Sequence, residues 1–282
     1  MMDQRKLHRF DACAQVLACP ICKQPVSREG TCLACAHGHR FDIARQGYVN
    51  LLRGAHAHDA YDRSSFEQRR RVFASGLYAP VAQAVVTALA ERSPSSGQPL
   101  RVLDAGCGEG YFAEAVRRTG AAVCAFDISR DSIQLAAGQN AEDGILWFVA
   151  DLAAIPVQDG AIDAVIDVFS PAHYGEFRRV LAPGGCVIKV VPTAHHLHEV
   201  RELAADQLRH SAYSNRRVID HFAASCRLIS RTTVSHTLAL TPKVRDALIA
   251  MTPLLFSVDA AAIDWSGLTR ATVEAEVLVG TW

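Results

Sequence analysis

Short apolar runs alternate with stretches of helical periodicity between residues 100 and 191. The apolar runs have the length of buried strands, and we predict strands at 100–104, 122–127, 146–150, 162–169 and 186–191. Helices are predicted between them at 110–119, 131–137 and 174–181. Strands that are apolar throughout and separated by helices form a parallel sheet covered on both faces.

The pattern changes after a helical stretch near 196–208. Polar and apolar residues alternate at 228–240 and 271–279, as in strands at the antiparallel end of a sheet, and a helix is predicted at 243–251. Five parallel strands followed by an antiparallel pair is the element order of class I methyltransferases. The expected fold is therefore α/β, a Rossmann-like methyltransferase domain with a seven-stranded sheet.

Two further parts precede this sheet. Residues 1–53 are rich in Cys, His and Arg and have little helical period. Residues 54–99 begin with a polar stretch, continue with amphipathic patterns at 66–73 and 81–89, and end in the Ser- and Pro-rich breaker 93–99. We expect a small N-terminal module at 1–53, a helical linker at 54–99 and the large domain at 100–282.

Composition limits the class of protein. The 282 residues suffice for one α/β domain of about 200 residues and a smaller module. Hydrophobic residues make up 50% and charged residues 21%, which excludes global disorder. No apolar stretch reaches the roughly 18 residues of a membrane span, and the first residues lack the apolar run of a secretion signal. We therefore expect a cytoplasmic protein that does not contact a membrane.

The net charge of zero conceals an uneven distribution. Residues 1–80 hold 12 Lys and Arg against 7 Asp and Glu, whereas residues 81–282 hold 17 against 22. A basic N-terminal part suits contact with a polyanion such as RNA. Ordinary scatter of surface charge explains the same numbers equally well.

The glycine-rich turn at 104–110 follows the first predicted strand and suits a cationic ligand. Gly106 and Gly108 allow the backbone to approach a ligand closely. Asp104 and Glu109 would repel a pyrophosphate, but they would attract the ammonium and sulfonium groups of S-adenosylmethionine.

Two more acids end predicted strands of the same sheet. Asp127 ends the second strand 23 residues after Asp104, where an acid binds ribose hydroxyls. Asp151 follows the third strand and is placed to accept a hydrogen bond from the adenine amino group. A single strand-end acid is readily explained as a solvated cap, but three in register favour S-adenosylmethionine as the cofactor.

Five of the nine cysteines lie in the first 35 residues, which indicates a metal site. Two residues separate Cys19 from Cys22, so both thiolates can bind one ion. Spacing leaves two ligand sets open, and either would form a closed, structural zinc site: Cys19, Cys22, Cys32 and Cys35, or Cys19, Cys22, Cys35 and His39.

Several motifs resemble the bacterial 23S rRNA (guanine-N1)-methyltransferases across nearly the whole chain. The resembling segments are 19–22, 35–42, 47–52, 69–71, 76–80, 104–110, 181–185 and 192–199. The resemblance implies the zinc ligands Cys19, Cys22, Cys35 and His39, which leaves Cys32 out. It also implies that the cofactor contacts Tyr78, Gly108, Glu109 and His196.

The loop after the fourth predicted strand faces the transferable methyl group in this fold. Guanine N1 carries a proton at neutral pH, so a base or a group that stabilises charge at O6 would assist its methylation. The candidates are Asp167, Ser170, His173 and Tyr174. Asp167 could instead be a structural strand-end carboxylate and His173 a helix N-terminal residue. Residues 169–174 differ from the enterobacterial members and are closer to a second branch of the family, which leaves the target guanine open.

The resemblance implies methylation of guanine N1 in a 23S rRNA hairpin. Contact with the RNA would fall to the zinc module and to basic residues at 40, 45, 53 and 69–71, although the last three could form a solvated helix face. Two other hypotheses are a small-molecule methyltransferase with a zinc lid and a non-catalytic RNA-binding or cofactor-sensing protein. A homodimer is one assembly that the sequence leaves open.

Overall fold

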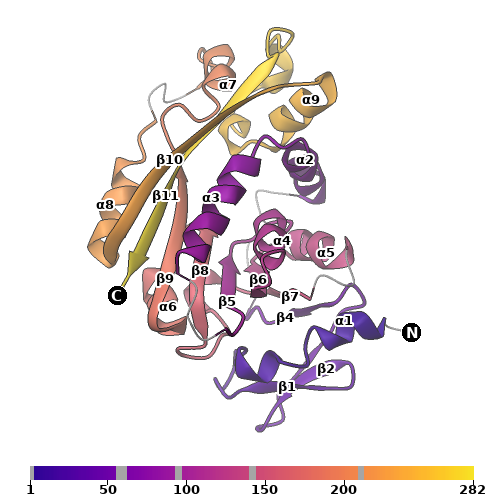
Figure 1. The fold of residues 1–282 in the computed structure, drawn as a ribbon. Helices are drawn as coiled ribbons and strands as arrows, with labels where there is room; N and C mark the ends of the chain where they lie inside the picture. Colours follow the sequence, from indigo (N-terminus) through magenta and orange to yellow (C-terminus); the bar gives the residue numbers. More distant parts are fainter. Residues whose placement is uncertain (1–2, 55–61, 93–96, 140–143, 209–212) are drawn as a thin grey trace.

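A computed structural model describes residues 3–54, 62–92, 97–139, 144–208 and 213–282 (Figure 1). The predicted breaker at 93–99 and the polar stretch after residue 54 lie partly outside the described residues. No single helix among the described residues is long and apolar enough to cross a membrane.

The large sheet confirms the predicted α/β fold. Its strands stand in the order β10-β11-β9-β8-β5-β6-β7-β4. All seven predicted strands are present: β5 (Arg101–Ala105), β6 (Ala122–Asp127), β7 (Leu146–Val149), β8 (Ile162–Val168), β9 (Leu181–Pro192), β10 (Arg227–Ala239) and β11 (Arg270–Thr281). Strands β5 to β9 pair in parallel, whereas β11 runs antiparallel to both β9 and β10.

The sheet has one strand more than the predicted seven. Strand β4 (Tyr48–Asn50), from the segment assigned to the N-terminal module, pairs in parallel with β7. The Tyr48 hydroxyl accepts hydrogen bonds from Arg130 Nε (3.0 Å) and Gln134 Nε2 (3.2 Å) of α5 (Arg130–Gln139). The N-terminal module is therefore joined to the large sheet by main-chain pairing.

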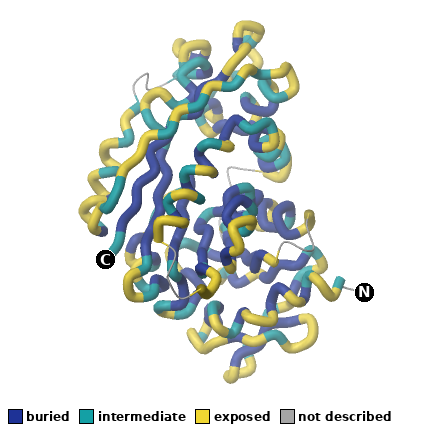
Figure 2. The backbone as a smooth tube through the Cα atoms, viewed as in Figure 1, coloured by how far each residue is buried: buried dark blue, intermediate teal, exposed yellow. Residues whose placement is uncertain are grey.

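Helices cover both faces of the sheet because its parallel strands are apolar on both sides (Figure 2). One face packs against α3 (Ala79–Ala90), α4 (Tyr111–Arg117), α5, α7 (His198–Leu203) and α9 (Pro242–Met251). Helix α2 (Arg63–Ala74) lies beside α9 on this side. The other face packs against α6 (Tyr174–Val180) and α8 (Arg216–Ser225).

The N-terminal module shares the core of this second face. It consists of α1 (Gln4–His8) and a three-stranded antiparallel sheet of β1 (Val26–Glu29), β2 (Cys32–Cys35) and β3 (Arg40–Asp42). The fully buried side chains of Phe10 and Leu33 belong to the same apolar cluster as Phe148 and Phe177 of the large domain. The module is thus held against the sheet by a continuous core.

Candidate functional site

The four side chains implied as zinc ligands converge at the tips of two turns. Cys19 and Cys22 precede β1, Cys35 ends β2, and His39 precedes β3. Their ligand atoms all lie within 4.8 Å of one another. His39 Nδ1 is 3.4 Å from Cys35 Sγ and 3.5 Å from Cys19 Sγ, and the Sγ atoms of Cys22 and Cys35 are 3.6 Å apart.

This donor set fits a structural zinc ion. Tetrahedral zinc with bonds of about 2.3 Å to sulfur separates its ligand atoms by about 3.8 Å, close to the spacings found here. Three thiols and one imidazole fill four coordination positions and leave none open for a substrate. The ion would hold the turn that precedes β1 and the β2–β3 turn together, which suits a module too small for a large core of its own.

Cys32 lies outside this cluster. It begins β2 while Cys35 ends that strand, and residues three apart in a strand point to opposite faces. The Cys32 thiol donates to the Glu29 carbonyl oxygen (3.2 Å) and accepts from Arg40 Nη2 (3.0 Å). Of the two ligand sets open from spacing, the structure therefore brings together the one with His39.

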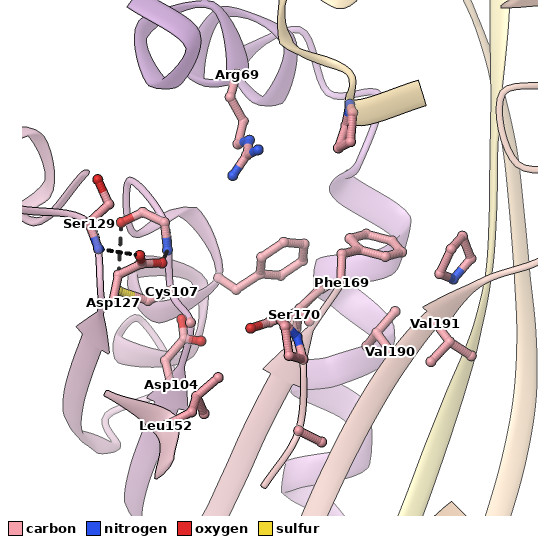
Figure 3. Close-up of a pocket in the computed structure, with 18 of the residues that line it drawn as sticks. Arg69, Asp104, Cys107, Asp127, Ser129, Leu152, Phe169, Ser170, Val190 and Val191 are labelled. Atoms are coloured by element: carbon pink, nitrogen blue, oxygen red, sulfur yellow. Dashed lines mark hydrogen bonds between the residues drawn. The ribbon is translucent and has the colours of Figure 1, made fainter. Parts of the chain in front are cut away.

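A cavity of about 1120 Å³ opens at the carboxyl ends of β5, β6, β7 and β8 (Figure 3). This edge is where open α/β sheets bind ligands. Every residue predicted to contact the cofactor lines it: Tyr78, Asp104, Gly106, Gly108, Glu109, Asp127, Asp151 and His196. Among the described residues, none from 3–54 lines the cavity.

Two carboxylates of the glycine-rich turn are buried in the wall of this cavity. Asp104 is 2% exposed and Glu109 is 3% exposed. Asp104 Oδ2 and Glu109 Oε1 have no hydrogen-bond partner among the described residues. Burial, with Asp167 and Asp127 nearby, raises the pKa of Asp104 well above its usual value. Burial raises the pKa of Glu109 to about 7. The wall therefore offers two buried carboxyl groups, which suit a cationic ligand.

Asp127 and Asp151 are fixed at neighbouring strand ends. Asp127 accepts hydrogen bonds from the backbone N–H groups of Gly108 and Ser129, each at 2.9 Å (Figure 3). Asp151 accepts from the backbone N–H of Ala153 (2.9 Å) and so caps a short 3₁₀ turn. Both acids are thus held at the rim by backbone amides.

Tyr78 and His196 meet on the side of the cavity toward β11. His196 is partly buried, and the loss of solvent around the ring lowers its pKa to about 4, so the ring is neutral. Its Nδ1 donates to the Glu274 carbonyl oxygen (3.1 Å), which leaves Nε2 to accept from the Tyr78 hydroxyl (3.5 Å). Sequence reasoning without the family resemblance offered no signal for this pair.

The four predicted catalytic residues occupy different environments. Ser170 and His173 line the cavity, and a Cβ atom on Gly106 would clash with the Ser170 side chain, so the glycine turn and the loop after β8 lie in contact. Tyr174 does not line the cavity. Its buried ring packs against Phe177 and Phe222 in the core of the opposite face.

His173 caps the first turn of α6. The backbone N–H of Glu176 donates to His173 Nδ1 (3.1 Å). A nitrogen that accepts this bond carries no proton, so the neutral ring keeps its proton on Nε2. The exposed ring therefore presents a donor at the cavity.

Asp167 lies beneath the cavity floor and is paired with a residue that sequence reasoning missed. Lys189 Nζ donates to Asp167 Oδ2 (2.8 Å), and both side chains are buried. Lys189 lines the cavity, whereas Asp167 does not. The sequence feature that could have identified Lys189 is that it is the one charged residue in the apolar run 186–191.

The basic residues predicted to contact RNA are also separated. Arg69 points from α2 into the cavity (Figure 3), whereas Arg71 is exposed and donates to Gln68 Oε1 (3.0 Å). Arg40 bonds to Glu29 and Cys32, and Arg45 is exposed on the zinc module. The run 69–71 is therefore not a uniform solvated face.

Comparisons with known proteins cover both parts of the chain. A family model described as "RlmA, N-terminal" matches residues 17–58, and one described as "Methyltransferase domain" matches residues 102–185. YxjB of Bacillus subtilis (strain 168), which its name assigns to the 23S rRNA (guanine-N1)-methyltransferases, is 31% identical over 93% of this chain and 95% of its own. The 23S rRNA (guanine(748)-N(1))-methyltransferase of Streptomyces fradiae is 32% identical over 84% of each chain.

A solved structure supports the fold independently. One chain of the complex between the Haloferax volcanii Trm112 methyltransferase activator and a methyltransferase superposes with a TM-score of 0.52. The identity is 18%, and the match covers 80% of this chain and 99% of that chain. At this identity the likeness is one of fold alone.

Replacing a zinc ligand should release the metal, while replacing Cys32 should not. We expect Cys35→Ser to lose bound zinc and to unfold at lower temperature, because the cluster loses one of its four donors. Cys32→Ser is the matched control, since it changes a thiol of the same strand outside the cluster. Metal content and thermal unfolding of both proteins are the measurements. Equal zinc loss in the two variants would contradict this ligand set.

The buried Glu109 should make the ligand-free protein less stable as the pH rises. Its pKa is about 7 in the folded chain against 4.5 for an ordinary Glu, so its contribution is fully present below 4.5 and is lost as the pH rises through 7. We expect Glu109→Gln to raise the free energy of unfolding at pH 8 by about 1–3 kcal/mol and to change little at pH 4.5. Urea unfolding at both pH values tests this, and a pH-independent difference would refute it.

Proposed function

The chain belongs to the family of 23S rRNA (guanine-N1)-methyltransferases, and we propose that it transfers a methyl group from S-adenosylmethionine to guanine N1 in a hairpin of 23S rRNA. The observation that carries this proposal is the cavity wall, in which one oxygen each of the buried Asp104 and Glu109 has no hydrogen-bond partner among the described residues, on the same chain as a zinc-ligand cluster. A cavity of this charge suits a cationic methyl donor better than a nucleotide phosphate.

Each acid at a strand end or in the glycine turn would face a different part of the methyl donor. Asp104 and Glu109 would face its cationic groups, Asp127 the ribose hydroxyls and Asp151 the adenine amino group. Tyr78 and His196 would bound the donor on the far side. When bound, S-adenosylmethionine supplies an electrophilic methyl group on a sulfonium. The residues that line the cavity would bind the donor and orient its methyl group toward the acceptor nitrogen.

The acceptor must lose a proton as the methyl group arrives. The donor would supply the methyl group that replaces the proton on N1, and this proton would pass to solvent water, because the assigned residues include no base. We assign His173 to the guanine O6 side, because its Nε2–H is a donor while its Nδ1 is occupied by the Glu176 amide. A donor at O6 stabilises the negative charge that develops there. Ser170 lies against Gly106 of the glycine turn, on the cofactor side of the cavity.

The zinc module would contact the RNA outside the cavity. The basic excess of residues 1–80 and the exposed Arg45 and Arg71 suit phosphate contacts on two sides of a bound hairpin. The target guanine must leave its stack, or lie unstacked in a loop, to enter the cavity. The cytoplasmic location and the homodimer stay predictions.

Primer extension tests the proposed function directly, because N1 methylation blocks base pairing. The purified zinc-loaded protein is incubated with unmodified 23S rRNA and S-adenosylmethionine, and stops are mapped along the rRNA. We expect one new stop at a guanine, with position 748 as the first candidate since the Streptomyces fradiae relative is named for it. Asp104→Asn is the negative control.

Two results would overturn the proposal. Methylation of components of a metabolite extract, with none of rRNA, would favour a small-molecule enzyme. Binding of S-adenosylmethionine without turnover on any RNA would favour a sensor.

His173 offers a second prediction, because its two nitrogens have separable roles. We expect His173→Asn to keep the helix cap and the stability while lowering kcat about 10²-fold, since its amide N–H groups lie on a shorter side chain and no longer reach O6. His173→Ala should lose the same activity and about 1 kcal/mol of stability as well. Single-turnover methylation and urea unfolding give the two readouts. Full activity of His173→Asn would limit the residue to capping.

A further inference from the structure

Lys189 and Asp167 form a buried ion pair between β8 and β9, and the residues on either side of each of them in its strand are buried and apolar. They stand opposite one another in the parallel register of β8 and β9. Their side chains are 3% and 0% exposed, and Lys189 Nζ lies 2.8 Å from Asp167 Oδ2. A buried pair of this kind contributes little net stability, because desolvation offsets the attraction between the charges. Two apolar residues would serve the sheet core at least as well.

The lysine also holds the loop that leaves β8. Lys189 Nζ donates to the carbonyl oxygen of Ser170, and the Phe169 N–H donates to the Val190 carbonyl oxygen (3.1 Å). Between these bonds Phe169 takes a left-handed conformation, with φ of 54°. A non-glycine residue reaches this region at a cost, which the surrounding contacts must offset. The ammonium group and the edge of β9 thus fix the loop from two sides.

The left-handed turn brings the Phe169 ring into the cavity. The ring is 36% exposed, which is unusual for a phenylalanine in this otherwise buried floor. Its centroid lies 5.9 Å from that of Tyr78 and 5.4 Å from that of His196, and Figure 3 shows it between the cofactor turn and β9. A partly exposed aromatic face at a cavity that must admit a base is suited to stacking.

We propose that Phe169 is the surface on which the target guanine stacks, and that Lys189, paired with Asp167, is the positioning residue that holds it there. This inference rests on the proposed function. Lys189 acts through the Ser170 carbonyl oxygen and does not contact the guanine. Asp167 keeps the ammonium group in place from below the floor.

The experiment uses full-length zinc-loaded protein and the 23S rRNA substrate. The positioning role is tested with the double variant Asp167→Asn, Lys189→Met, which removes both charges and so leaves no unpaired buried ion. The stacking role is tested with Phe169→Leu, and Phe169→Tyr is its conservative control. We measure kcat, KM for rRNA, the Kd of S-adenosylmethionine and thermal unfolding for each protein.

We expect the double variant to keep its fold and its Kd for S-adenosylmethionine within about threefold, while kcat falls about 10²-fold through misplacement of the base. Phe169→Leu should lose at least tenfold in kcat/KM for rRNA, and Phe169→Tyr should restore it. A Phe169→Trp variant gives a spectroscopic readout, since stacking quenches indole fluorescence when rRNA binds. The quench should disappear when the paired charges are also removed.

The outcomes separate this inference from the proposed function. If the unaltered protein methylates rRNA and the double variant keeps its kcat, the positioning role is wrong. If Phe169→Leu is fully active, the stacking role is wrong. If the unaltered protein leaves rRNA unmethylated, the proposed function itself fails.

Discussion

Burial of negative charge at the carboxyl ends of the parallel strands is the constraint on which the site depends. Strands β5 and β8 are neighbours, so Asp167 lies close enough to contribute to the raised pKa of Asp104, which is caused mainly by burial. Carboxylates buried together cost free energy unless a proton or a cation compensates them. Lys189 supplies this compensation for Asp167. For Asp104 and Glu109 the structure offers a cavity large enough to admit a cation from outside.

The zinc module acts on the large domain through packing rather than through the cavity. Its core is continuous with the face of the sheet that bears α6 and α8, on the side opposite α3 and α4. The main chain reinforces this junction, because Ala18 donates to the Pro156 carbonyl oxygen (2.9 Å) and Gln158 donates to that of Val16 (2.8 Å). An RNA held by the module would therefore meet the cavity in a fixed orientation.

The apolar runs were sufficient to predict where the main strands lie along the chain. The reason is that the strands of a parallel sheet, buried on both faces, are apolar throughout. Strand β4 escaped prediction since three residues carry too little pattern and their partner lies about a hundred residues away. The metal spacing left Cys32 and His39 as alternatives. The choice between them follows from the bounds of β2, because Cys32 and Cys35 lie at its two ends and so point to opposite faces of the strand. The sequence alone did not give these bounds.

The loop after β8 was harder to predict than the residues at the strand ends. An acid at the end of a predicted strand can be recognised from its place in the sequence alone. The roles of residues 167–174, by contrast, depend on the direction in which each side chain points, which the sequence does not give. The Tyr174 side chain points into the core, and Nδ1 of His173 accepts the hydrogen bond that caps α6. The role of Lys189 could not be predicted, because its pairing with Asp167 depends on the register of two neighbouring strands. Family resemblance supplied Tyr78 and His196, for which the local sequence has no distinguishing pattern.

The pairing of β4 with β7 has a consequence for the order in which the chain folds during synthesis. Residues 48–50 leave the ribosome long before residues 146–149, with which they must pair. The nascent N-terminal module therefore presents an open strand edge for the time needed to make about a hundred residues, a hazard for association with other chains. Zinc captured at this stage would keep the module compact until β7 emerges. Metal supply to the growing chain would then govern the yield of folded protein as well as its final stability.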